Sequence, residues 1–131
     1  MLKQLLAVVA GTFFAHASVA GEPYQLESDA GLYKLHLTPN VSEVVIGELH
    51  SWHLRIADTN GEMIDGAKVL VDGGMPAHGH GLPTAPKVTE SDETGRYLIE
   101  GLRFNMPGKW EIQLEIEGTA GFDTAKLELR L

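Results

Sequence analysis

Two histidines stand two positions apart in a stretch rich in glycine and proline. The stretch covers residues 73–84, with His78 and His80 separated by one glycine and Met75 three positions before the first histidine. Imidazole nitrogen and thioether sulfur are borderline and soft metal ligands, and their combination suits copper. The residue types therefore favour a metal-binding loop for copper. The alternative is a tight crossover whose histidines only hydrogen-bond backbone carbonyls, and both remain open at this point.

The lack of cysteine restricts the metal sites and the cross-links that the chain can form. Without a thiolate, zinc-ribbon and blue-copper sites are excluded, and so is a disulfide framework. A metal ion would have to be held by His, Met, carboxylate or backbone oxygen.

The chain has 18 Asp and Glu against 10 Lys and Arg, a formal net charge of −8. Nucleic acid and anionic lipid both need a basic face, so we expect neither as a partner.

Residues 1–20 have the features of an export signal. Lys3 supplies a positive charge, an apolar run follows as far as Ala15, and positions 18–20 read Ser-Val-Ala, small residues of the kind a signal peptidase recognises. The run is shorter than the roughly 20 apolar residues of a membrane-spanning helix. We therefore expect a signal peptide over 1–20 and a soluble periplasmic protein, without a membrane span, over 21–131. That length fits a single domain.

The elements that must position the candidate ligands are predicted to be strands. Residues 109–117 alternate most clearly, because Trp110, Ile112, Leu114 and Ile116 share one face and polar residues share the other. Shorter alternating or apolar segments, separated by turn residues, predict further strands at 32–38, 49–57, 67–71, 87–89, 96–102 and 125–131. About seven short strands predict an all-β fold, an antiparallel immunoglobulin-like β-sandwich.

Strand order then predicts where the ligands meet. If successive strands run up and down, the connections 39–48, 73–86 and 103–108 lie at one end of the sandwich. In an extended His-Gly-His segment the two rings would face the same way. We therefore expect one copper site formed by His78, His80, His50, Met75 and Met106.

Each of the other candidates also has a purely structural explanation. His50 begins a strand and fits a half-buried core position, and Met75 and Met106 fit the gap-filling role common for methionine. His36 and His53 fall on outward faces, so we expect both to be exposed.

Three segments resemble a known group of exported domains. They are Gly-Gly-Met-Pro-Ala-His-Gly-His-Gly-Leu-Pro-Thr at 73–84, Gly-Arg-Tyr at 95–97 and Gly-Leu-Arg-Phe-Asn-Met-Pro-Gly-Lys-Trp at 101–110. Over roughly residues 45–117 the chain is similar to YtkA-like and FixH-like domains. The resemblance implies an Ig-like β-sandwich and export. For some relatives it also implies copper handling or cytochrome oxidase assembly.

We therefore expect a periplasmic protein that binds copper reversibly and buffers the ion or passes it to another periplasmic or membrane protein. The alternative is an interaction module without metal, which uses the same loop end to contact another exported protein. No Ser/His/Asp arrangement and no nucleotide-binding glycine motif are evident. An enzyme is not expected.

Overall fold

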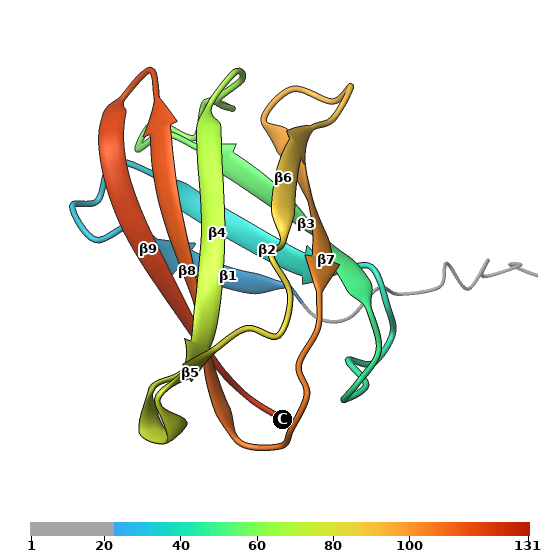
Figure 1. Ribbon diagram of the computed structural model, residues 1–131. Helices are drawn as coiled ribbons and strands as arrows, with labels where there is room; N and C mark the ends of the chain where they lie inside the picture. The colour runs from blue at the N-terminus through green and yellow to red at the C-terminus, as the bar shows by residue number, and fades with distance from the viewer. Residues whose placement is uncertain (1–22) are drawn as a thin grey trace, which may run out of the picture.

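The computed structural model describes residues 23–131, which form two antiparallel β-sheets packed face to face (Figure 1). The predicted all-β sandwich is therefore confirmed. The predicted signal peptide, residues 1–20, lies outside the described residues. Within residues 23–131 there is no helix with the length and apolar character needed to cross a bilayer.

The first sheet has five strands and the second has four. In spatial order the first contains β1 (Tyr24–Glu27), β2 (Lys34–Pro39), β3 (His50–Ala57), β7 (Arg96–Leu102) and β6 (Lys87–Glu90). The second contains β5 (His80–Gly81), β4 (Lys68–Met75), β8 (Lys109–Gly118) and β9 (Gly121–Arg130). A 3-10 turn, η1 (Pro76–His78), lies between β4 and β5. Two strands were not predicted, the short β1 and the two-residue β5.

The core lies between the sheets and follows the predicted alternation. On β8, Trp110, Ile112 and Ile116 are fully buried, whereas Gln113 and Glu115 are exposed. Leu35, Leu54 and Ile99 supply the facing layer from the first sheet. Removal of these apolar surfaces from water is the main stabilising contribution of the fold.

The glycine-rich stretch begins as a strand, which corrects the prediction of a loop from Gly73 onward. Gly73 pairs with Ile112 and Gly74 with Glu111, so β4 continues as far as Met75. The physical reason is the close approach of the backbones, because a Cβ atom on Gly74 would collide with the carbonyl oxygen of His80. Glycine here allows two strands to pair closely. Its low strand propensity is the reason that the sequence does not predict this role.

The predicted end of the sandwich is confirmed as the meeting place of three connections. Figure 1 shows η1 and the connection between β7 and β8 together at its lower end. The backbone N–H of Gly47, in the connection between β2 and β3, donates to the carbonyl of Phe104 at 2.7 Å. This hydrogen bond joins two of the three connections.

Candidate metal centre

A tight reversal between β4 and β5 positions the two loop histidines. Pro76 starts the 3-10 turn, and Gly79 ends it with φ at 65°, in the left-handed region that favours glycine. The N–H of Gly79 donates to the carbonyl of Pro76 at 3.2 Å. The segment is thus a turn, not the extended strand from which we expected the rings to share a face. The turn still brings the ring centroids of His78 and His80 to 6.0 Å, with an angle of 27° between the planes.

His80 and Met106 meet across the end of the sandwich. The Nε2 atom of His80 lies 3.3 Å from the Sδ atom of Met106. Trp110 holds both partners in place, because its indole N–H donates to the carbonyl of Met106 at 3.0 Å and its ring packs edge-on against His80, with 5.6 Å between centroids. Trp110 is itself fully buried in the core. The pair is therefore anchored to a side chain of the hydrophobic core.

The other nitrogen of His80 fixes its tautomer. Nδ1 lies 3.0 Å from the carbonyl oxygen of Gly81. A carbonyl oxygen can only accept a hydrogen bond, so Nδ1 carries a proton, and in the neutral form of the ring Nε2 presents its lone pair toward Met106. Sequence reasoning missed this contribution of Gly81, because every residue type carries a carbonyl and no sequence signal marks it.

Met75 lies beneath His80. The two residues are direct cross-strand partners in the β4–β5 pair, so their side chains share one face of the sheet. Met75 is only 1% exposed, whereas His80 is half-buried and His78 is exposed. Exposure to solvent therefore increases from the buried thioether of Met75 to the exposed imidazole of His78.

His50 is in a different environment from the loop histidines. It is 9% exposed and packs against Phe104 and Trp52, with ring centroids 5.5 and 6.3 Å away. Its Nδ1 lies 3.1 Å from the carbonyl of Glu48, and its Nε2 is buried without a hydrogen-bond partner among residues 23–131.

Rings link His50 to His80 indirectly. Phe104 contacts Trp110 with 5.1 Å between centroids, and Trp110 in turn contacts His80. His50 thus shares the expected end of the sandwich but reaches the loop histidines only through two other side chains. Its assignment as a ligand stays a prediction.

The two histidines expected to be exposed differ. His36 is exposed on β2, as expected. His53 is half-buried, which corrects the expectation, and burial followed by the nearby positive charge of Arg96 lowers its pKa. Neither residue is grouped with the centre at the end of the sandwich.

The candidate centre is defined by its Met and His side chains: Met75, His78, His80 and Met106. Within residues 23–131, no cluster of three or more His, Cys, Asp or Glu side chains has the arrangement of a metal site. The donor set of this centre is therefore a thioether–imidazole set. Such a set has two soft sulfur donors and two borderline nitrogen donors.

Comparison with known proteins places the fold in a family. No curated protein sequence matches the chain at a significant level. Among solved structures, the chain is similar to the ZirS C-terminal domain with 12% sequence identity and a TM-score of 0.45, over 99% of this chain and 82% of that one. The family model described as YtkA-like matches residues 27–115. This range begins at the last residue of β1 and adds β2 to the predicted resemblance over roughly residues 45–117. The chain belongs to the YtkA-like family.

Proposed function

We propose that the protein binds a copper ion reversibly through His80 and Met106 and buffers the ion or passes it to a partner. His78 and Met75 are the further donors in this proposal, which describes a binding protein and not an enzyme. The observation that carries it is the 3.3 Å contact between His80 Nε2 and Met106 Sδ. In the neutral form of the ring both atoms present lone pairs, which attract each other only through a proton or a cation between them.

The hydrogen bond at the far side of the His80 ring supports this assignment. Metal-ligating histidines almost always donate their other N–H to a carbonyl, carboxylate or water, which fixes the ring and raises the basicity of the ligating nitrogen. His80 donates from Nδ1 to the carbonyl of Gly81 in this way. Its Nε2 atom is thereby oriented before any ion arrives.

The separation of the two donor atoms fits a shared ion. Bonds of about 2.0 Å to nitrogen and about 2.3 Å to sulfur put two neighbouring ligands of a tetrahedral ion about 3.5 Å apart. The Nε2 and Sδ atoms are 3.3 Å apart. Little movement of either side chain is needed for both to hold one ion.

The donor types favour copper over other ions. Thioether sulfur is a soft ligand that favours Cu(I), and imidazole accepts both oxidation states of copper. The formal net charge of −8 adds a weak general attraction for cations without selecting one.

Fluorescence offers a direct test, because Trp110 contacts His80. Copper held by His80 should quench Trp110 emission, and titration of the metal-free protein with Cu(I) and with Cu(II) would measure the affinity. We expect His80→Ala and Met106→Leu to weaken binding and His36→Ala, an exposed histidine on β2, to leave it unchanged. Equal copper affinity of the wild type and the His80→Ala/Met106→Leu double variant would contradict the proposal.

A further inference from the structure

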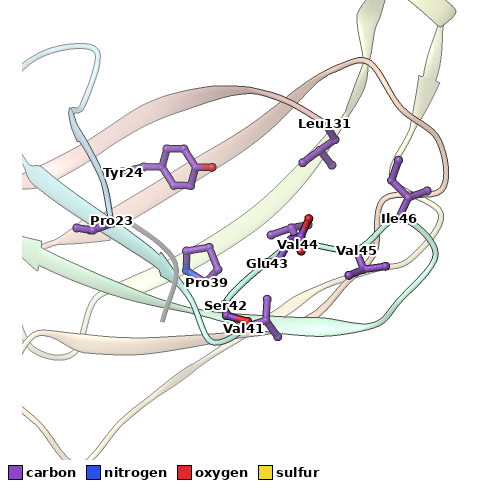
Figure 2. A pocket seen from close by; sticks show the side chains of 10 residues that line it. All are labelled: Pro23, Tyr24, Pro39, Val41, Ser42, Glu43, Val44, Val45, Ile46 and Leu131. Carbon is purple, nitrogen blue, oxygen red and sulfur yellow. The ribbon is translucent and has the colours of Figure 1, made fainter. Parts of the chain in front are cut away.

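An apolar groove runs along the connection between β2 and β3, at the same end of the sandwich as the candidate metal centre. Its volume is about 700 Å³. Figure 2 shows its lining, to which β1 contributes Tyr24, β2 contributes Pro39, and the connection contributes Val41, Val44, Val45 and Ile46. The chain past the end of β9 adds Leu131.

Two of the apolar side chains that line this groove are exposed to solvent and are not packed into the core. Val45 is 44% exposed and Ile46 40%, and Leu49, further along the same connection, is 65% exposed. Contiguous exposed apolar side chains mark contact sites more often than isolated ones do. Three such residues within five positions are therefore a candidate contact surface.

Backbone hydrogen bonds hold the connection in its exposed conformation. The N–H of Asn40 donates to the carbonyl of Ser51 at 2.9 Å, and the N–H of Gly47 donates to the carbonyl of Phe104 at 2.7 Å. The N–H of Glu48 closes a turn onto the carbonyl of Val45 at 3.2 Å. A surface fixed in this way loses little conformational freedom when a partner binds.

The charges beside the groove indicate the chemistry of the partner. Residues 40–49 contain two acidic residues, Glu43 and Glu48, and no lysine or arginine. Both glutamates are exposed, and neither takes part in any of the ion pairs formed by residues 23–131. Unpaired carboxylates beside apolar side chains complement a segment that combines apolar residues with basic ones.

We propose that the groove is a docking site for a partner protein segment in which apolar residues alternate with lysine or arginine. The apolar residues would contact Val45 and Ile46, and the basic residues would pair with Glu43 and Glu48. A second copy of this chain fits less well, because it would bring a net charge of −8 and the same carboxylates to the interface.

The docking proposal does not depend on metal binding. It does place the partner close to the candidate centre, since Gly47 of the groove connection is hydrogen-bonded to Phe104 in the connection that carries Met106. A docked partner would therefore lie at the end of the sandwich where His80 and Met106 meet.

A synthetic peptide of alternating leucine and lysine is a suitable probe. Titrated into isotope-labelled, metal-free protein, it should shift the backbone amide resonances of residues 41–49 and of β1, and added salt should weaken its binding. Val45→Ser/Ile46→Ser should lower the affinity about tenfold or more through lost apolar contact. Glu43→Gln/Glu48→Gln should lower it and flatten its salt dependence.

Matched controls are available on the outward face of the second sheet. Leu70 and Phe122 are 54% and 60% exposed there, with Glu115 and Glu117 between them on β8. Leu70→Ser/Phe122→Ser and Glu115→Gln/Glu117→Gln should leave peptide binding unchanged. If the control variants weaken peptide binding as much as the groove variants do, binding depends only on overall charge and exposed apolar surface. That result would refute the docking site.

Two further measurements separate the competing explanations. Sedimentation of the protein alone should show a monomer, and a dimer abolished by Val45→Ser/Ile46→Ser would assign the groove to a second copy and overturn the proposal. His80→Ala/Met106→Leu should bind the peptide as the wild type does. If the wild type binds the peptide but does not bind copper, the docking site is supported and the metal-binding proposal is contradicted.

Discussion

The Nε2 atom of His80 lies 3.3 Å from the Sδ atom of Met106, although 26 positions separate the two residues in the chain. His80 belongs to a two-residue edge strand, and Met106 belongs to the connection that crosses from β7 in one sheet to β8 in the other. The pair therefore exists only when both sheets are assembled. Because a ligand that binds only the folded state stabilises it, copper should raise the melting temperature of the protein if it binds here.

Met106→Leu should lower Cu(I) affinity by about tenfold or more, the loss seen even for residues that only support a ligand. Cu(II) affinity should fall less, because the thioether prefers the softer ion. Leucine has a similar volume, so stability without metal should change by less than about 1.5 kcal/mol. Competition against a chelator in both oxidation states would measure the two affinities. Equal losses for Cu(I) and Cu(II) would show that Met106 is not a thioether ligand.

Gly74→Ala should displace the segment that carries His80. The added Cβ would collide with the carbonyl oxygen of His80, and relief requires movement of backbone, at a cost of about 1–3 kcal/mol. Copper affinity should fall together with stability. Gly81→Ala is the matched control, because its Cβ would lie 3.4 Å from the nearest atom, the carbonyl oxygen of Gly73. Chemical denaturation with and without copper would compare the two, and an undisturbed Gly74→Ala protein would mean that the β4–β5 pairing is looser than described.

Ile112→Ala should lower the free energy of unfolding by about 2–5 kcal/mol, because it removes a fully buried side chain and leaves a cavity. Gln113→Ala, at the next position of β8 and exposed, should change it by about 0.5 kcal/mol or less. Urea denaturation of both variants and of the wild type would measure these changes in the free energy of unfolding. Similar losses at the two positions would contradict the described arrangement of β8, in which Ile112 faces the core and Gln113 faces solvent.

Asp123→Asn should destabilise the protein near neutral pH and less so in acid. Hydrogen bonds, first from the hydroxyl of Ser28 and then from the backbone amides of Ala30, Thr124 and Leu32, hold the pKa of the Asp123 carboxyl below its ordinary value. The folded state therefore favours the carboxylate, so its stabilising contribution is present above the ordinary aspartate pKa of about 3.9 and is lost as the pH falls through the lowered pKa of the folded state.

Thermal unfolding of wild type and Asp123→Asn at several pH values would test this dependence. The difference in stability between them should shrink as the pH falls below about 4. Asp92→Asn, exposed in the turn between β6 and β7, is the control and should show a smaller effect at every pH. A difference for Asp123→Asn that stays constant with pH would show that its role is packing and not charge.

Alternation of apolar and polar residues was sufficient to predict the sandwich, the buried face of β8 and the end at which three connections meet. These features are local, because the side-chain direction in a strand repeats every two residues and antiparallel strands must reverse at every connection. Residues 73–74 were predicted as loop for an equally local reason, since glycine favours turns. Their pairing with Ile112 and Glu111 depends on how closely β8 approaches, and no single segment encodes that distance.

The sequence by itself determined the donor chemistry of the candidate centre: with no cysteine and with histidine and methionine concentrated in the end connections, thioether and imidazole are its characteristic donors. The tertiary structure decided which of them meet. It brought His80 to Met106 because Trp110 is hydrogen-bonded to one and packed against the other. It linked His50 to the loop histidines only through Phe104 and Trp110, because two large rings fill the core at that end. Residue types follow from the sequence, whereas distances between side chains depend on how the two sheets pack.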